Sequence, residues 1–159
     1  MKAARRETIR VGDHAPSFRL PALDGPEQSL VDLLRQGPVL VAFFKISCPT
    51  CQLTFPYLSR LSAGGVRFAG ISQDDAASTR AFQKRFGVNF TLLLDEAGGY
   101  PASNAYGITH VPAMFLVEPD GAVAAAWAGF SKADMDKLAA RLRLPLFAAG
   151  DNAPQWKPG

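Results

Sequence analysis

The hydrophobic pattern of the chain alternates between short apolar runs and longer amphipathic stretches. Val39–Phe44 is apolar at every position, which predicts a strand covered on both faces. Other short apolar runs predict four further strands, at Val66–Ile71, Phe90–Leu94, Ala113–Val117 and Ala122–Ala128. The last two flank Glu118-Pro119-Asp120-Gly121, where proline fixes φ and glycine admits positive φ, so they are predicted to form a hairpin.

The amphipathic stretches predict helices between these strands. A helix from about Pro49 to Ser62 ends at Gly64-Gly65. Asp74 and Asp75 are candidate N-caps for a second helix that ends near Phe86. A short helix follows at Pro101–Tyr106, and a last one begins at Ser131 with the core stripe Met135, Leu138, Ala139 and Leu142. Strands that alternate with helices before a closing hairpin and helix predict an α/β fold, with a central mixed sheet and helices on both faces.

The two ends of the chain show weaker patterns. We divide it into a basic N-terminal arm at 1–11, one domain at 12–144 and an extended tail at 145–159, docked through Phe147 or Trp156. Before Val39 we expect only a short strand at Ser17–Leu20 and a helical turn at Leu30–Arg35.

Composition places the chain among globular proteins. Its 159 residues are 48% hydrophobic and 19% charged, enough for one domain that buries about 70% of its unfolded-chain surface. The net charge of +3 is accompanied by basic residues near the N-terminus, but no basic stripe interleaved with aromatics follows, which excludes nucleic acid as the expected partner.

Targeting signals are not visible in the sequence. Met1–Gly12 lacks the apolar core of a secretory signal, and no stretch is long enough to span a bilayer. The cytoplasm is therefore the predicted location, with the periplasm as the alternative if a leader has been removed.

The chemistry of the chain centres on Ser47-Cys48-Pro49-Thr50-Cys51, which holds its only two cysteines. Cys48 follows the Val39–Phe44 strand at the expected helix N-terminus, where unpaired backbone N–H groups stabilise a thiolate. Pro49 suits the first helical position because its missing N–H has no partner there. Cys51, one turn further on, is expected to be more buried. We therefore expect Cys48 to attack a partner disulfide and Cys51 to resolve the mixed disulfide, forming a Cys48–Cys51 disulfide.

A cysteine pair with this spacing is also half of a typical zinc site. A second Cys/His pair is absent, since His14 and His110 are far apart in sequence. We expect no metal and no cofactor, and keep a three-ligand site of Cys48, Cys51 and His110 as an alternative.

The arrangement of motifs resembles the thioredoxin fold, and within it the TlpA/ResA-like and redoxin (AhpC/TSA-like) branch. Pro56 lies five residues after Cys51, where thioredoxins carry a helix-kinking proline, and Gly129 falls at the glycine before the last helix. The segment Tyr106–Pro112 matches the one that ends in the family's cis-proline. The helix after Asp75 and the strand Phe90–Leu94 fit the added central strand-helix layer of these branches.

The resemblance implies how a partner binds. Val111–Pro112 would be a cis bond, and the Val111 backbone would pair with an extended partner segment beside Cys48, with Pro49 and Thr50 also in contact. The partners implied are protein thiols and disulfides together with an upstream electron donor, and we expect a monomer.

The chain departs from the family where residues usually tune the cysteines. Ser47 replaces a tryptophan, while Ala42 and Thr54 replace the acids of thioredoxins and ResA-like proteins, so no obvious carboxylate serves Cys51. His110 stands where thioredoxins have glycine. We expect its imidazole to tune the site as a partner of the Cys48 thiolate or as a proton carrier.

The sequence therefore favours a thiol-disulfide oxidoreductase. The first alternative is a peroxiredoxin-like peroxidase, in which Cys48 reduces a peroxide and Cys51 resolves the sulfenate. Peroxiredoxins carry Thr three residues before the reactive Cys and Pro further upstream, whereas this chain has Lys45 and Val41. The second alternative is a metal-binding or chaperone-like module that uses the same loop.

Overall fold

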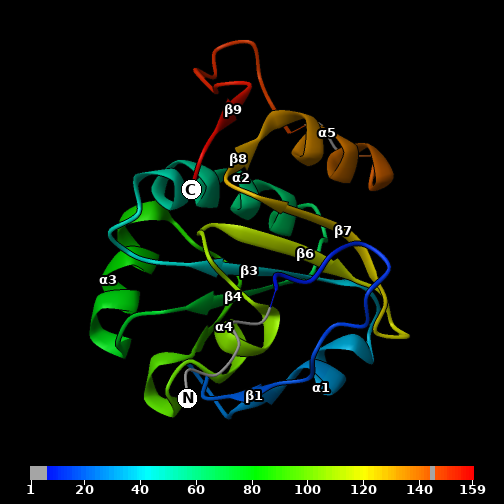
Figure 1. Cartoon of the computed structure of the whole chain (residues 1–159). Helices are drawn as coiled ribbons and strands as arrows, with labels where there is room; N and C mark the ends of the chain where they lie inside the picture. Colours follow the sequence, from blue (N-terminus) through cyan, green and yellow to red (C-terminus); the bar gives the residue numbers. More distant parts are fainter. Residues whose placement is uncertain (1–6, 144–145) are drawn as a thin grey trace.

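The centre of the molecule is a five-stranded mixed sheet (Figure 1). The computed structural model describes residues 7–143 and 146–159. The strands lie in the order β5-β4-β3-β6-β7. Their bounds are β3 Val39–Phe44, β4 Phe68–Ser72, β5 Thr91–Leu94, β6 Ala113–Val117 and β7 Val123–Ala128. Strands β3, β4 and β5 are parallel, whereas β6 and β7 run antiparallel to their neighbours, as the βα order followed by a hairpin predicts.

Strand β3 is central, and all six of its residues are buried. Successive side chains of a strand point to opposite faces, so β3 supplies two cores. Leu40, Ala42 and Phe44 join one hydrophobic cluster, and Val39, Val41 and Phe43 join the other. A strand with both faces covered reads as an uninterrupted apolar run, which is why the sequence predicted its bounds correctly.

Helices cover both faces of the sheet and complete the three layers. The first cluster receives side chains from α2 (Pro49–Ala63), α3 (Ala76–Phe86) and α5 (Lys132–Arg141). The second receives them from α1 (Leu30–Leu34) and α4 (Pro101–Tyr106). Figure 1 shows α2 and α5 above the sheet and α1 and α4 below it.

The predicted strand-helix addition, α3 with β5, forms one edge of the sheet. The Asp75 side chain caps α3 by accepting a hydrogen bond from the Ser78 N–H, and Gly87 ends the helix with φ 63°. Strand β5 then pairs in parallel with β4, with Leu93 opposite Ile71. The two elements thus widen the sheet on the side away from the β6–β7 hairpin. A 3₁₀ turn, η1 (Glu96–Gly98), leads on to α4.

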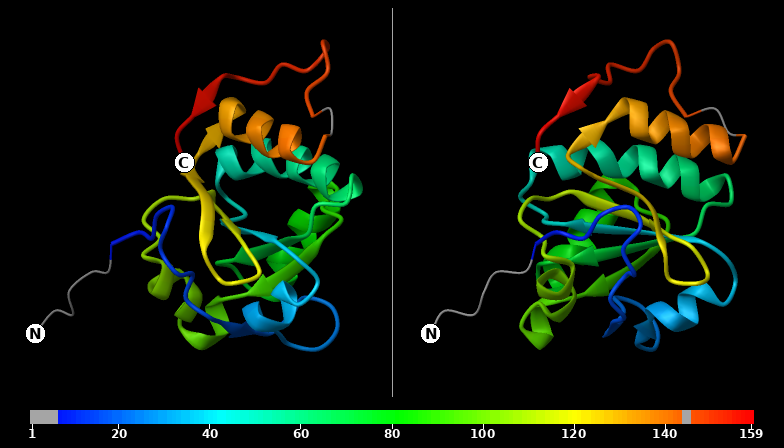
Figure 2. Two further views of the ribbon diagram at one scale, coloured as in Figure 1. Left: turned by 90° about the vertical axis from the view of Figure 1, so that its right-hand side faces the viewer. Right: turned by 45° about the vertical axis from the view of Figure 1, so that its right-hand side comes forward.

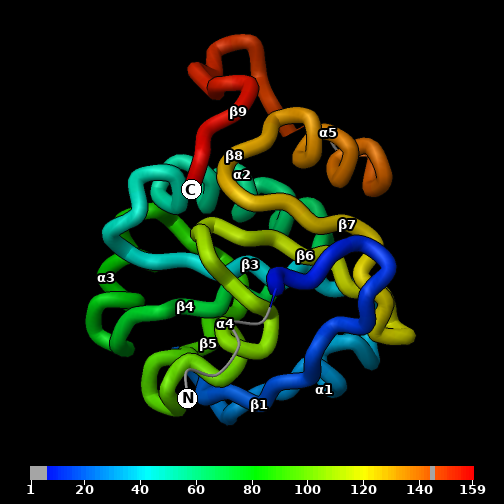
Figure 3. Tube along the Cα trace, in the orientation of Figure 1, coloured from blue at the N-terminus to red at the C-terminus, as the bar shows by residue number. Residues whose placement is uncertain are grey.

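The N-terminal segment lies against the opposite edge (Figure 3). The Gly12 N–H donates to the Val123 carbonyl at 3.0 Å, and the Ala15 N–H donates to the Gly121 carbonyl at 2.9 Å. The chain then forms a small antiparallel ribbon from β1 (Arg19–Leu20) and β2 (Gln28–Ser29). The sequence predicted β1, at Ser17–Leu20, but not the two-residue β2.

The tail returns along α5 and pairs with the main body. Strand β8 (Phe130–Ser131) and strand β9 (Trp156–Lys157) form an antiparallel ribbon that the sequence did not predict. Of the two expected docking residues, Phe147 packs against Tyr57 with the ring centroids 4.8 Å apart, whereas Trp156 is 62% exposed.

The predicted boundary at 144–145 and the basic residues at 1–6 lie outside the described residues. Over the part of the chain that the structure describes, every helix is too short or too polar to cross a membrane.

Candidate active site

Cys48 occupies the N-cap of α2, at the carboxyl end of the central strand. Pro49 is the first helical residue, and Cys48 has the extended backbone of a cap, with φ −81° and ψ 113°. Its sulfur accepts a hydrogen bond from the Cys51 N–H at 3.1 Å. The thiol therefore takes the place of a capping oxygen, in contact with the positive end of the helix dipole. Cys48 is partly exposed.

Hydrogen bonds from two neighbouring elements fix the loop before Cys48. The Ile46 N–H donates to Oδ2 of Asp74 at 2.8 Å, and Nε2 of Gln52 donates to the Ile46 carbonyl at 2.9 Å. The Cys48 N–H donates to the Lys45 carbonyl at 3.3 Å. The chain thus turns from β3 into α2 with little freedom, which holds the sulfur in one place.

Cys51 lies one turn inside α2 and is fully buried. Burial is the main cause that raises the pKa of the Cys51 thiol, and a side-chain hydrogen bond with Cys48 raises it further. A backbone hydrogen bond with Lys45 lowers it, and the negative charge of Asp74 raises it slightly. Cys51 therefore stays protonated at neutral pH. The pair combines a partly exposed cysteine, Cys48, with a fully buried one, Cys51.

The loop before β6 completes the site from the other side. The Val111–Pro112 peptide bond is cis, as the resemblance implies. The Cys48 thiol donates to the Val111 carbonyl at a sulfur–oxygen distance of 3.5 Å. Two segments more than sixty residues apart thus meet at the Cys48 sulfur, with the Val111 backbone beside it.

The remaining predicted site residues differ in their surroundings. Pro49 is exposed, while Thr50 is buried and donates its hydroxyl hydrogen bond to the Pro158 carbonyl at 2.6 Å. His110 is exposed in the Val111 loop, and its Nδ1 hydrogen-bonds with the Thr109 hydroxyl at 3.0 Å. The expected tuning role of His110 stays a prediction.

Cys48, Cys51 and His110 do not form a metal cluster. Among residues 7–143 and 146–159, no group of three His, Cys, Asp or Glu side chains is placed to hold a metal ion. The three-ligand alternative therefore has no geometric support.

Asp74 is the acidic side chain that sequence reasoning missed. It follows β4, which lies parallel and next to β3, so the carboxyl ends of both strands meet at the same sheet edge. The sequence offered Asp74 and Asp75 equally as caps of α3. The structure uses Asp75 as the cap and turns Asp74 toward the cysteine loop. Adjacency of β3 and β4 was the signal that could have placed it there.

The sheet order and the helix layers define a thioredoxin-like fold, with a cysteine pair at the first turn of α2. A crystal structure of a Chlorobium tepidum protein assigned as a thiol:disulfide interchange protein DsbE has the same fold, with a TM-score of 0.74 at 25% identity. The similarity covers 86% of this chain and 97% of the other.

The chain belongs to the AhpC/TSA family, whose sequence model matches residues 11–126. It is 34% identical over 120 residues to the thiol:disulfide interchange protein DsbE of Escherichia coli (strain K12), covering 74% of this chain and 64% of that protein. It is 30% identical over 125 residues to the thiol-disulfide oxidoreductase ResA of Bacillus subtilis (strain 168), and the match covers 76% of this chain and 68% of that protein. The chain thus spans just under two thirds of the E. coli relative.

Proposed function

We propose that this chain is a thiol-disulfide oxidoreductase that exchanges electrons with protein disulfides through Cys48 and Cys51. The observation that carries the proposal is the asymmetry of the pair. The Cys48 sulfur is half-buried and receives a backbone N–H at the start of α2, whereas Cys51 is fully buried behind it. This arrangement suits an attacking thiolate and a resolving thiol.

The exchange proceeds in two balanced steps. The Cys48 thiolate attacks one sulfur of a partner disulfide, that S–S bond breaks, and the first partner sulfur leaves and takes up a proton. Cys51 then loses its proton and attacks the Cys48 sulfur, which releases the second partner thiol. The partner gains two electrons and two protons, and the chain is left with a Cys48–Cys51 disulfide. The raised pKa of Cys51 keeps this thiol protonated in the dithiol form that begins the exchange.

The Val111 loop supplies the backbone surface for the partner. An extended segment that adds to the Val111 backbone brings its disulfide to Cys48, because the Val111 carbonyl lies 3.5 Å from the Cys48 sulfur. Pro49 and Thr50 border the same surface. We infer that the chain works as a monomer on protein thiols and disulfides, and that an upstream donor restores the dithiol.

The direction of the exchange depends on the reduction potential of the Cys48–Cys51 pair relative to that of its compartment. The cytoplasm, predicted first, keeps thiols reduced, whereas the alternative, the periplasm, is oxidising. Trapping the thiols with acid and alkylating them in intact cells reports the resident redox state. A pair found mostly reduced supports delivery of electrons to partners.

His110 provides a separate test of tuning. If its imidazole assists the Cys48 thiolate, then His110→Ala moves the pH midpoint of Cys48 alkylation upward, because the thiolate loses that partner. His14→Ala is the matched control, since His14 contacts the β6–β7 hairpin at Ala122 and lies outside the site. Equal midpoints in the wild type and both variants would show that His110 does not tune the Cys48 thiol.

The decisive assay offers the reduced protein two oxidants. We expect reduced protein to reduce insulin disulfides with multiple turnovers when a dithiol donor is present, and to consume hydrogen peroxide no faster than a free thiol. Rapid peroxide consumption with insulin untouched would support the peroxidase alternative. Inactivity toward both would overturn an enzymatic role for the pair.

A further inference from the structure

The last five described residues lie on the surface beside the cysteines. We call residues 155–159 the tip. Figure 2 shows this segment descending from α5 to the N-terminal end of α2. Lys157 pairs with Phe130 of β8 across the ribbon, and the Lys132 N–H donates to the Gln155 carbonyl at 3.0 Å. The Thr50 hydroxyl, between the two cysteines in sequence, donates to the Pro158 carbonyl at 2.6 Å.

The tip lies so close to the backbone at Val111 and Gly129 that only glycine fits at positions 159 and 129. A Cβ atom on Gly159 would overlap the Val111 carbonyl oxygen and stand 3.3 Å from the Pro112 nitrogen. A Cβ atom on Gly129, where φ is 77°, would overlap the Lys157 carbonyl oxygen. The Val111 carbonyl also faces the Cys48 sulfur. The tip therefore covers the backbone surface on which a partner segment must lie.

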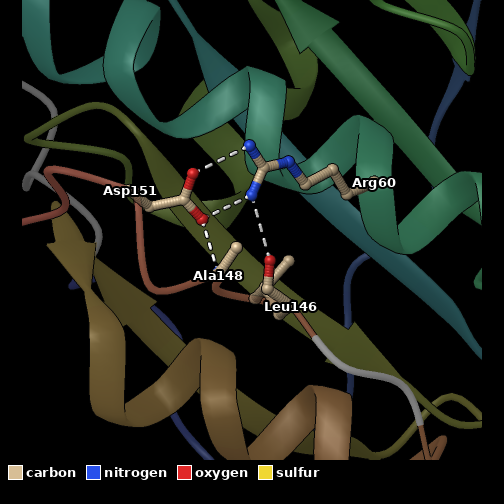
Figure 4. Close-up of polar contacts among 4 residues, drawn as sticks. All are labelled: Arg60, Leu146, Ala148 and Asp151. Atoms are coloured by element: carbon tan, nitrogen blue, oxygen red, sulfur yellow. Dashed lines mark hydrogen bonds and ion pairs between the residues drawn. The ribbon is translucent and has the colours of Figure 1, made fainter.

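The segment before the tip is held more firmly. We call residues 146–151 the root. Arg60 of α2 forms a two-pronged ion pair with Asp151, with nitrogen–oxygen distances of 2.7 and 3.1 Å (Figure 4). Arg60 also donates to the Leu146 carbonyl at 3.1 Å, and the Ala148 N–H donates to Asp151 at 2.7 Å. The hydrogen bonds from Arg60 and Ala148 lower the pKa of Asp151 to about 2, so the pair stays charged at neutral pH.

The root buries Leu146, which is 5% exposed, whereas the tip buries little apolar surface. Its largest side chain, Trp156, is 62% exposed and adds little buried apolar area. It is attached through the short β8–β9 ribbon and the hydrogen bonds of Gln155 and Pro158. A tip of this kind can leave the surface while the root keeps it nearby, at a high effective concentration.

We infer that the tip is a built-in competitor of the protein partner. It occupies the Thr50–Val111 surface as an extended segment, so a partner segment must displace it before its disulfide reaches Cys48. This inference rests on the proposed function, and it adds that the chain regulates access to its own site. A site that is open only part of the time lowers the apparent affinity by the open fraction, which raises KM and leaves kcat nearly unchanged.

The test compares two valine substitutions in the full chain. In Gly159→Val, the new side chain collides with the Val111 carbonyl and forces the tip outward. Gly150→Val is the matched control, because a Cβ atom there has nothing within 4 Å. Chymotrypsin cleavage after Trp156 reports whether the tip is released. Insulin reduction at varied insulin concentration then gives KM and kcat for the wild type and both variants.

We expect Gly159→Val to be cleaved faster after Trp156 and to lower the KM for insulin by about threefold or more, with kcat changed by less than about twofold. Gly150→Val should match the wild type in both measurements. Cleavage that is no faster in Gly159→Val overturns the docked tip. Faster cleavage with an unchanged or higher KM overturns the competition alone. Absence of insulin turnover in all three proteins overturns the proposed function, and the competition falls with it.

Discussion

The N-termini of α2 and α5 offer the same unpaired backbone N–H groups but carry different caps. At α5, the Ser131 hydroxyl accepts from the Asp134 N–H at 3.2 Å and donates to the Asp134 carboxylate at 2.6 Å. At α2, the Cys48 sulfur accepts from the Cys51 N–H at 3.1 Å, and the residue three positions on is a buried thiol rather than an acid.

The two caps differ in the groups that they leave free to react. A serine and an aspartate satisfy each other at α5, so the cap is a closed structural unit. At α2, the Cys48 sulfur satisfies one N–H group, and no acid closes the cap. The same helix-end geometry therefore forms a closed structural cap in one place and holds a partly exposed thiol in the other. The tip links the two, since Trp156 pairs with Ser131 and Pro158 reaches Thr50.

The largest effect is expected when the α2 cap is made like the α5 cap. Cys48→Ser keeps an atom that accepts the Cys51 N–H, so the free energy of unfolding should change by less than about 1 kcal/mol. Insulin turnover should nevertheless be lost, because a serine hydroxyl does not attack a disulfide. Urea unfolding and the insulin assay measure the two effects separately. Retained turnover would contradict the role of Cys48.

The second effect is a loss of stability of the reduced protein at alkaline pH. Burial raises the folded-state pKa of Cys51 above its ordinary value of 9.0, so the unfolded chain loses this proton first. Stability is therefore fully present below pH 9 and should fall by roughly 1 kcal/mol per pH unit above it. Urea unfolding of the reduced protein between pH 7 and pH 11 measures the slope.

Tyr106 is the control for this slope. Its pKa is also raised by burial, from 10.0, so it adds its own loss of stability above pH 10. Cys51→Ala should therefore flatten the curve between pH 9 and pH 10, whereas Tyr106→Phe should flatten it only above pH 10. A slope that persists in Cys51→Ala would show that other groups cause it.

The smallest effect is expected at the α5 cap. Ser131→Ala removes the acceptor of the Asp134 N–H and should lower the free energy of unfolding by about 1 kcal/mol. Insulin kcat should stay within about twofold of the wild type, because Ser131 does not contact either cysteine. Urea unfolding and the insulin assay together check both statements. A collapse of kcat would mean that the two helix ends are coupled.

Local pattern in the sequence was sufficient for most of the sheet and helices. The continuous apolar run of β3 and the Pro-Asp-Gly turn between β6 and β7 each carry their own signal. The bounds of β4 differed from the predicted Val66–Ile71 by two residues at the start and one at the end. Element ends of this kind depend on pairing with neighbours rather than on the apolar run itself.

Features that depend on distant contacts could not be predicted in this way. Phe130–Ser131 looks like a helix start, and Trp156–Lys157 lies among prolines, so the β8–β9 ribbon has no local signature. It depends on pairing between distant residues, Phe130 with Lys157 and Ser131 with Trp156. The choice between Asp74 and Asp75 is similar, since two adjacent carboxylates look alike until the sheet places one beside the cysteine loop.

A trapped mixed disulfide shows which of the two cysteines attacks the partner. Cys51→Ser and Cys48→Ser are each reduced, mixed with a disulfide-bonded protein substrate, quenched with acid and analysed by intact mass. We predict that Cys51→Ser accumulates a mixed disulfide through Cys48, because the resolving thiol is absent, and that Cys48→Ser forms none. A mixed disulfide through Cys51 in Cys48→Ser, with none in Cys51→Ser, would contradict the assignment of the attacking and resolving cysteines.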